Sequence, residues 1–403
     1  MGFTIGVSGA GRFSPGFIAL FKAHPLIDDV CVADIRRDRA DRAAAEHGLS
    51  RAFGSHEELC KSDVDAVAVF SQRHLHGPMT IEALDAGKHV YCAVPISQSI
   101  EEIQAIVERV ENSRLIYMTG ETSYYYPSTV YCRKRFAAGD FGEFVYGEGQ
   151  YLHDMVDFYN SFQYSGGSDW PQVAGIPPMY YPTHSTSMVL SVTGAHATHV
   201  SCLGQIDNHD DGIFRTGANL WDNVFSNQSA LMRTSDGGAL RVNEFRRIGW
   251  HGLASVQLSL FGTKSCFEEQ ANSQVWSNLE NHDVVDLTET LRVHGRGSGP
   301  EDAADAFSRD LAAGFSSVHA TERLPAEFEG MPNGHLGSHQ FLVDDFVRSV
   351  DTGLLPPNHV WNAARYCIPG LVAHESANRG GVQMEIPDLG DPPADWEVLT
   401  PDG

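Results

Sequence analysis

In the first 120 positions, apolar residues form short runs, and most of these runs are followed by a segment with helical spacing. The strand-like runs cover residues 4–8, 29–34, 66–71, 89–94 and 115–119. Segments with the 3.6-residue period of amphipathic helices run from the first strand to about residue 23, over 78–86 and over 100–110. Apolar strands that alternate with helices predict a parallel, doubly wound sheet covered on both faces.

The pattern changes after residue 143. Longer strand-like stretches cover 144–153, 229–234, 239–245 and 254–261. The Thr234–Gly238 segment, TSDGG, is a hairpin turn signal between two of them and favours a mostly antiparallel sheet. The stretch 268–325 is polar and rich in Gly and Ser, and we predict a long variable excursion there. Further on, 340–350 is amphipathic, and 363–377 is helical with an expected interruption at Pro369-Gly370.

Together these patterns predict an α/β protein of two domains. Residues 1–122 would form an N-terminal Rossmann domain, and residues 123–403 a C-terminal α+β domain. A chain of 403 residues, 42% of them hydrophobic, is long enough for two such cores. The helix over about 363–377 is expected to pack back on the first domain.

A glycine turn joins the first strand to the first helix in the sequence Gly9-Ala10-Gly11-Arg12-Phe13-Ser14. Gly9 permits a tight turn, and Gly11 lets a pyrophosphate approach the backbone. The helix N-terminus then offers unpaired N–H groups to an anion. Ser14, at the position usually held by Gly or Ala, is small enough to keep helix and strand close. This arrangement predicts a dinucleotide site.

An acid at the end of the second strand refines the choice of cofactor. Asp34 lies 25 residues after Gly9, where a carboxylate binds the ribose diol and repels a 2′-phosphate. This favours NAD. Arg36 and Arg37 follow, and because arginine accepts a 2′-phosphate, NADP stays open as the second choice. In such sheets the ligand lies at the carboxyl ends of the strands, and the groups expected there are Ser71, Gln72, Ala93, Val94 and Pro95.

Charge and cysteine content narrow the choice of partners. The formal net charge of −24 argues against nucleic acid and anionic membranes. No apolar run approaches the roughly 20 residues of a membrane span, and the N-terminus has no signal-peptide pattern. The seven cysteines are scattered without a CxxC pair, as is usual for reduced thiols. We therefore expect a cytoplasmic protein.

The stretch from Gly87 to Pro95, GKHVYCAVP, resembles the GKHVxxEKP motif of the glucose–fructose oxidoreductase/inositol dehydrogenase (Gfo/Idh/MocA) family. His76 matches the family's histidine after the polar triplet, and the resemblance implies that it serves the cofactor site. The resemblance extends through the second half. It implies a sugar or polyol substrate, a second domain with the substrate site on one sheet face, and a homodimer or homotetramer.

The chain departs from the family at one position. Ala93-Val94-Pro95 stands where the family has Glu-Lys-Pro. The family's lysine lies near the nicotinamide and the reacting hydroxyl, whereas Val94 can neither donate a hydrogen bond nor carry a charge. The expected cofactor domain therefore lacks one expected catalytic group.

The segment 177–187, PPMYYPTHSTS, holds the main catalytic candidate. His184 matches the family's histidine in the second domain, while Tyr180 and Ser187 replace its usual acidic companions. Histidine can take the proton of a hydroxyl as hydride leaves, since its pKa lies near the working pH. A structural histidine held by hydrogen bonds is the alternative. Glu121, His153 and Tyr181 are the next acid/base candidates.

Polar side chains near the strand ends are candidates for substrate binding, because tyrosine stacks on sugar faces and acids bind diols. These candidates are Tyr124, Tyr125, Asp154, Tyr180, His335 and His339. His335 and His339 have helical i, i+4 spacing, and with His153, Asp154 and His184 they would be the set for a metal site. Gly334 and Gly337 weaken that helix and no HExxH pattern is present, so we expect no metal.

Three functions follow from these features. The first is an NAD-dependent oxidoreductase acting on a secondary hydroxyl of a sugar, polyol or glycoside, with His184 as acid/base. The second, implied by some relatives, is a glycoside hydrolase that retains NAD and works by transient ring oxidation, elimination, hydration and re-reduction. The third is a non-enzymatic NAD-binding regulator, which the missing lysine would suit and the polar cluster around His184 would not.

Overall fold

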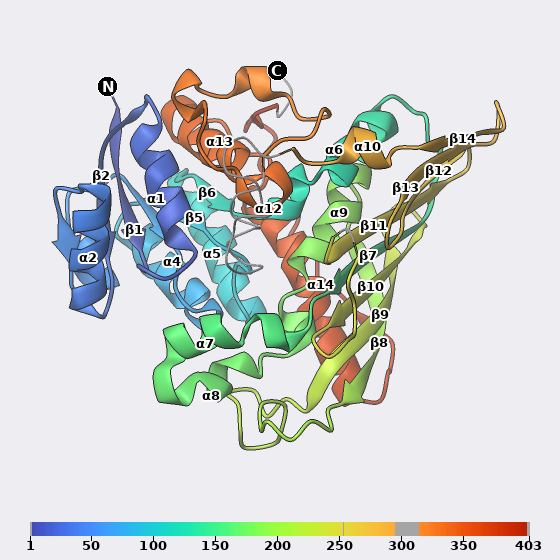
Figure 1. Ribbon diagram of the computed structural model, residues 1–403, viewed down its shortest axis with the longest axis horizontal. Helices are drawn as coiled ribbons and strands as arrows, with labels where there is room; N and C mark the ends of the chain where they lie inside the picture. The colour runs from blue at the N-terminus through green and yellow to red at the C-terminus, as the bar shows by residue number, and fades with distance from the viewer. Residues whose placement is uncertain (1, 253, 295–313, 401–403) are drawn as a thin grey trace.

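The computed structural model describes residues 2–252, 254–294 and 314–400. Two sheets divide the chain, as Figure 1 shows, with the N-terminal sheet and its helices on the left and a large sheet on the right. The first sheet is parallel throughout, in the order β3-β2-β1-β4-β5-β6. Its strands are β1 (Phe3–Ser8), β2 (Ile27–Ala33), β3 (Ala52–Phe53), β4 (Ala66–Val69), β5 (His89–Cys92) and β6 (Tyr117–Thr119).

Helices cover this sheet as the alternating pattern predicts. They are α1 (Ser14–Ala23), α2 (Arg37–His47), α3 (His56–Cys60), α4 (His76–Asp85) and α5 (Ile100–Ser113). The apolar strands are buried because helices pack on both faces, so the doubly wound prediction is confirmed. Each predicted strand agrees with the structure to within about two residues at its ends.

The second sheet has nine strands in the order β14-β13-β12-β11-β7-β10-β9-β8-β15. The strands are β7 (Phe144–Leu152), β8 (Ala197–Ile206), β9 (Phe225–Thr234), β10 (Ala239–Phe245), β11 (Val256–Gly262), β12 (Ser265–Glu269), β13 (Gln274–Asn278), β14 (Asp283–Asp286) and β15 (Met384–Glu385). The predicted turn at 234–238 joins β9 and β10 as an antiparallel pair. Among the described strands of this sheet, β7 and β10 are the one pair that runs parallel, so both strands end at the same edge of the sheet.

Helices on the inner face connect this sheet to the first domain. They are α6 (Pro127–Ala137), α9 (Thr183–Thr193), α13 (His339–Thr352) and α14 (Val360–Asn378). The α9 helix packs on β7 and β10, α13 packs on α1, and α14 contacts β8, α9, α5 and β6. The C-terminal helix therefore touches the first domain. None of the helices in the described part of the chain combines the length and the apolar composition that a bilayer crossing requires.

Two expectations about the second half are wrong. The helix α14 runs through Pro369 without a break. Proline fits helical φ angles and removes only one hydrogen bond, and the burial of most of this helix outweighs that loss. The polar stretch from residue 268 is also more regular than predicted, because β13, β14 and α10 (Thr288–Leu291) extend the sheet edge. Residues 295–313 of that stretch lie outside the described residues.

A smaller unit leaves the end of β7 and returns to α9. It contains η3 (Met155–Asp157), α7 (Tyr159–Gly166), η4 (Gly167–Asp169), α8 (Trp170–Ala174) and η5 (Pro178–Tyr180). Met155 and Ala174 of this unit form a small apolar cluster with Ile213 and Phe214, which lie between β8 and β9. Figure 1 shows α7 and α8 below the first domain. This unit contributes side chains to the region between the domains.

Candidate active site

A buried histidine–carboxylate pair joins the two domains. His184 lies in the first turn of α9, and Glu121 follows β6 at the carboxyl edge of the first sheet. His184 Nδ1 lies 2.6 Å from Glu121 Oε1. The two side chains are 5% and 0% exposed. Because Nδ1 donates to the carboxylate, the hydrogen bond assigns the ring proton to Nδ1 and leaves the Nε2 lone pair to accept a proton.

Ser123 fixes the geometry of this pair. Its backbone N–H donates to Glu121 Oε1 at 2.9 Å, and its Oγ lies 2.8 Å from the same oxygen. The same hydroxyl lies 2.9 Å from the His184 carbonyl oxygen and 2.6 Å from Ser187 Oγ. Ser187, which stands where the family often has an acid, thus helps to connect the domains.

The electrostatics of Glu121 keep it charged. Burial raises the pKa of a carboxyl group, but the positive charge and hydrogen bond of His184 outweigh burial and hold the pKa of Glu121 below its ordinary value. An ionised Glu121 stabilises a protonated His184. The pair can therefore take up a proton at Nε2 in a site from which water is largely excluded.

A close approach of backbones places α9 against the sheet. A Cβ on Gly149 of β7 would lie 1.9 Å from the Ser185 carbonyl oxygen, so only glycine allows this packing. Gly149 therefore sets the position of His184.

Two tyrosines form walls beside His184. The rings of Tyr151 and Tyr181 lie edge-on to the imidazole, with centroid distances of 5.4 and 5.2 Å. Arg246 lies over the Tyr151 ring and Arg73 over the Tyr181 ring, both 4.4 Å from the centroid. Burial raises the pKa of the Tyr151 phenol and of the Tyr181 phenol above the ordinary value of tyrosine. Both side chains are therefore neutral hydrogen-bonding groups near pH 7.

A second line of proton-carrying groups starts at Tyr151. Its hydroxyl lies 3.0 Å from His153 Nδ1, and His153 Nε2 lies 3.2 Å from Asp157 Oδ2. The imidazole of His153 is partly exposed, unlike that of His184. The site therefore holds two histidine–carboxylate systems that approach from neighbouring elements.

A buried ion pair at the end of β10 was not foreseen from the sequence. Glu244 is the register partner of Tyr151 across the parallel β7–β10 pair. Its carboxylate accepts from Ser185 Oγ and from Arg246, whose Nη2 lies 2.9 Å away. Burial raises the pKa of Glu244 to about 8, because Arg246 and Ser185 offset only part of the desolvation. The position of Glu244 at a strand end was the only available signal.

The glycine turn has the form that a dinucleotide requires. Gly9 has φ +107°, and a Cβ there would lie 2.6 Å from the Phe70 carbonyl oxygen. Around Gly11, by contrast, an added Cβ would meet no atom within 4 Å. No side chain caps the start of α1, so its first N–H groups face open space beside Gly11. Ser14 is fully buried at the start of that helix.

Asp34 holds this turn from the end of β2. One carboxylate oxygen accepts the N–H of Ala10 and the other that of Arg36, both at 2.8 Å. Each oxygen keeps a lone pair that a ribose hydroxyl can use. A cavity of about 360 Å³ opens beside the turn, lined among others by Arg12 and Arg39 and covered by Tyr164 of α7. These features fit a bound dinucleotide.

His76 connects two strand ends at the same edge. Its Nδ1 lies 2.8 Å from the Pro95 carbonyl oxygen and its Nε2 lies 3.1 Å from that of Ser71. Burial lowers its pKa to about 4, so the ring is neutral. Val94, in place of the family's lysine, is buried at this edge. His76 therefore fixes the backbone around the expected nicotinamide position.

The remaining cofactor candidates differ in their contacts and exposure. Gln72 donates to the Ser165 carbonyl oxygen of α7 at a long 3.5 Å. Arg36 is exposed and pairs with Asp38. The ring of Phe13 packs against Phe70 and against His335 and His339. The two histidines thus lie beside the glycine turn, whereas a sugar site was expected.

The structure does not bring the other substrate candidates to His184. Tyr125 lies in a buried network, where its hydroxyl donates to Asp345 and accepts from Arg323. Asp154 caps a short helix and accepts the Ile248 N–H. Tyr180 packs on His374, and Tyr124 lies under Arg133. These side chains have structural partners, and among the described residues no group of three or more His, Cys, Asp or Glu is placed to hold a metal.

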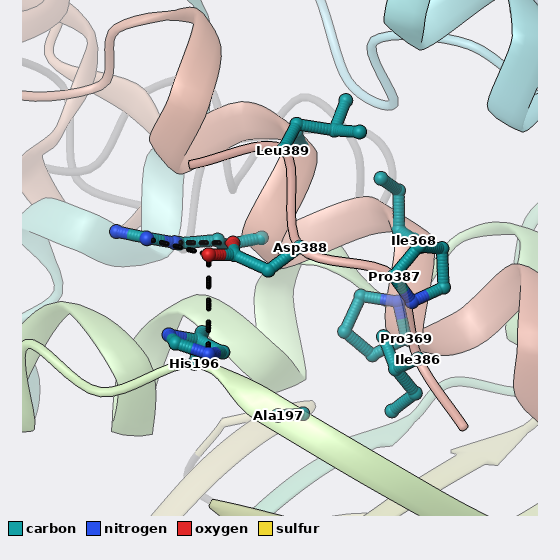
Figure 2. A pocket seen from close by; sticks show the side chains of 10 residues that line it. His196, Ala197, Ile368, Pro369, Ile386, Pro387, Asp388 and Leu389 are labelled. Carbon is teal, nitrogen blue, oxygen red and sulfur yellow. Dashed lines mark hydrogen bonds and ion pairs between the residues drawn. The ribbon is translucent and has the colours of Figure 1, made fainter. Parts of the chain in front are cut away.

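Another small cavity lies between the start of β8 and α14 (Figure 2). Its volume of about 10 Å³ has room for one water. Asp388 receives two hydrogen bonds from Arg365 and lies 3.9 Å from His196. This cluster attaches the C-terminal segment to α14 and is structural.

Comparison with known proteins agrees with this geometry. Residues 3–121 match the family model described as an oxidoreductase family with an NAD-binding Rossmann fold. This is the model of the Gfo/Idh/MocA family. The Rossmann domain of the chain is thus an NAD-binding domain, and the predicted family and cofactor are confirmed.

Similar proteins and solved structures cover nearly the whole chain. A glycosyl hydrolase family 109 protein of Streptomyces filamentosus is 25% identical, over 96% of this chain and 77% of its own length. One from Saccharopolyspora erythraea is 28% identical, over 96% of this chain and 83% of its own length. The fold also matches that of a levoglucosan dehydrogenase in complex with NADH and levoglucosan, with a TM-score of 0.72 and 17% identity. The match covers 96% of this chain and 100% of the dehydrogenase chain.

Proposed function

We propose that this protein oxidises a secondary hydroxyl of a sugar, polyol or glycoside, with NAD as the hydride acceptor. The observation that carries the proposal is the buried Glu121–His184 pair, whose Nε2 is available beside the carboxyl edge of an NAD-binding sheet. NAD, when bound, would be the acceptor of the hydride that leaves the carbinol carbon. Gly9, Gly11, the start of α1 and Asp34 would hold it.

His184 acts as the base in this proposal. Its Nε2 takes the hydroxyl proton, and the ionised Glu121 stabilises the resulting imidazolium. The low exposure of both groups strengthens this electrostatic effect. Val94 stands where the family has a lysine. In this proposal His184 therefore carries out the proton transfer that this lysine cannot assist.

The neighbouring side chains fit a carbohydrate. Tyr151 and Tyr181 offer aromatic faces and hydroxyl groups within the same small region. Sugars present C–H faces that pack on aromatic rings and hydroxyls that need hydrogen-bond partners. Levoglucosan, a sugar, is the ligand in a complex of similar fold.

A second candidate is glycoside cleavage by a closed cycle. The substrate hydroxyl is first oxidised to a ketone, which acidifies the adjacent C–H. A base removes that proton as the aglycone leaves, water adds to the resulting double bond, and the ketone is reduced again. The net reaction consumes water and no NAD. The Tyr151–His153–Asp157 line favours this candidate, since the cycle needs a second acid/base group, and relatives along the whole chain carry the name of a glycosyl hydrolase family.

The purified protein can distinguish these functions. Bound nucleotide is released and identified, and the protein is then incubated with sugars and with aryl glycosides. Net NADH formation supports the dehydrogenase, and aglycone release without net NADH supports the closed cycle. Tight NAD binding with neither activity would favour a regulator.

The His184→Ala variant tests the assigned base. We expect it to lose either activity by about 10²- to 10⁴-fold, because the proton acceptor is gone. NAD content should match that of the wild type, since His184 lies in the second domain. Full activity in this variant would overturn the assignment.

We also propose that the protein works in the cytoplasm as a homodimer or homotetramer. The cysteines of the described residues are unpaired thiols, which suits a reducing compartment. Leu203 and Leu231 on strands β8 and β9 are 67% and 56% exposed, which suits a subunit contact. Light scattering of the purified protein measures the subunit number.

A further inference from the structure

Arg73 occupies a special place at the domain boundary. It begins the short helix η1 (Arg73–Leu75) directly after the carboxyl end of β4. Its guanidinium lies over the rings of Tyr181, at 4.4 Å, and of Phe162, at 5.5 Å. The Tyr181 ring is itself in edge contact with His184. Arg73 therefore belongs to the wall of the candidate active site, although it comes from the Rossmann domain.

Arg73 has no carboxylate partner within the described part of the chain. Three other arginines of the second domain do pair with a carboxylate, Arg246 with Glu244, Arg247 with Asp211 and Arg323 with Asp344. The chain has 52 acidic residues against 28 lysines and arginines, so acids are plentiful. The partners of Arg73 are the Tyr181 and Phe162 rings and a hydrogen bond to the Tyr181 side chain. None of these is a counter-charge near pH 7.

The acids of the site contact other groups, Glu121 the ring of His184 and Glu244 the guanidinium of Arg246. Neither carboxylate forms an ion pair with Arg73. Aromatic rings contact the face of a guanidinium, which leaves its in-plane N–H donors for other groups. Such a fork matches a carboxylate bidentately. An anionic substrate group would neutralise the cation and fill these donors.

We propose that Arg73 is a specificity-determining residue that selects carbohydrates bearing a carboxylate, such as uronic acids and their glycosides. The inference rests on the proposed function and narrows its substrate class. The diphosphate of the dinucleotide is the other possible anion. The substrate is favoured because Arg73 contacts the tyrosine beside His184, whereas the diphosphate position is set by Gly11 and the start of α1.

The test compares matched neutral and acidic probes on the NAD-loaded protein. The probes are D-glucose against D-glucuronate, and 4-nitrophenyl β-D-glucoside against 4-nitrophenyl β-D-glucuronide, with the galactose and galacturonate pairs added. Binding is measured by calorimetry, and turnover by NADH formation and 4-nitrophenol release. We expect an acidic member to bind more tightly than its neutral counterpart.

Arg73→Gln should remove this preference. We expect its affinity for the acidic probe to fall by about 10- to 100-fold while the neutral probe changes little. Arg73→Lys should recover part of the loss, since it restores the charge without the fork. Arg109→Gln is the matched control, because it removes one guanidinium, paired with Asp85, from the same domain and should change neither probe.

The outcomes separate the inference from the function. Equal losses for acidic and neutral probes, together with weaker NAD binding, would assign Arg73 to the diphosphate and overturn the inference. Equal binding of both probe types by the wild type would also overturn it. Tight binding of a uronate without turnover of any probe would retain the inference and contradict the proposed oxidation.

Discussion

Glu121 and His184 carry the proposed chemistry at the scale of single residues. The carboxylate makes one hydrogen bond to the imidazole and two to Ser123, and all three groups are buried. The negative charge of Glu121 therefore acts on the imidazole ring of His184. The consequence is that charge and hydrogen bonding at residue 121 can be tested separately.

Glu121→Gln keeps the shape and removes the charge. We expect kcat to fall by about 10³- to 10⁴-fold with a small change in KM, because a neutral amide stabilises the imidazolium poorly and can favour the other tautomer. Steady-state kinetics and the bound NAD content check this. Ser123→Ala, which leaves the carboxylate in place, should cost less than about 10-fold. Similar losses in both variants would mean that the pair is only structural.

At the scale of elements, the backbone contact between β7 and α9 sets the position of His184. Ser185 approaches Gly149 so closely that a methyl group has no room. A change at this strand position should therefore act on the helix and its histidine together.

Gly149→Ala should shift α9 away from the sheet. We expect a loss of about 1–3 kcal/mol in the free energy of unfolding, since overpacking forces backbone movement, and a lower kcat. Urea unfolding followed by circular dichroism gives the first value. Gly249→Ala is the control, because an added Cβ there meets no atom within 4 Å. A Gly149→Ala protein as stable and active as the wild type would refute this account.

The elements also show where sequence reasoning succeeds and where it stops. The glycine turn, Asp34 and Glu121 follow directly from strands that periodicity reveals, so their place at one sheet edge could be predicted. Glu244 could not, although its strand was predicted correctly. It reaches Ser185 only because β10 pairs in parallel with β7, and no local pattern encodes that pairing.

The same limit explains the misplaced candidates. Tyr125, directly after the Rossmann strands, looks like a site residue in the sequence. Its ring instead stacks on Phe341 of α13, a contact between segments more than 200 positions apart. His335 and His339 were expected at the sugar and lie beside Phe13 for the same reason. Long-range packing of α13 on the first domain decides all three positions.

At the scale of the whole molecule, buried histidines make the fold sensitive to acid. Burial lowers the pKa of His76, His319, His359 and His374 to about 4 each. The unfolded chain binds these protons near pH 6.5, whereas the folded chain does not until about pH 4. Each histidine therefore contributes stability that is present above pH 6.5 and is lost as the pH falls toward 4.

We expect the free energy of unfolding to fall between pH 6.5 and 4 by up to about 1.4 kcal/mol per pH unit for each of these histidines. Urea unfolding at several pH values measures the slope. His374→Gln should lower the slope, relative to the wild type, by the contribution of one histidine. Among the described residues the His374 ring has a hydrogen bond to Gln228 and ring contacts with Tyr180 and Phe225. Constant stability from pH 7 to 5 would contradict the prediction.

The Glu121–His184 contact also bears on how such proteins can change over generations. The carboxylate stands at position 121 and the imidazole at position 184, and in the proposed mechanism neither works without the other. A recombinant that joins the front of one relative to the back of another can fold and hold NAD, yet it is a working enzyme only if both partners arrive together. Crossovers between positions 121 and 184 are therefore the ones that selection would remove most strictly.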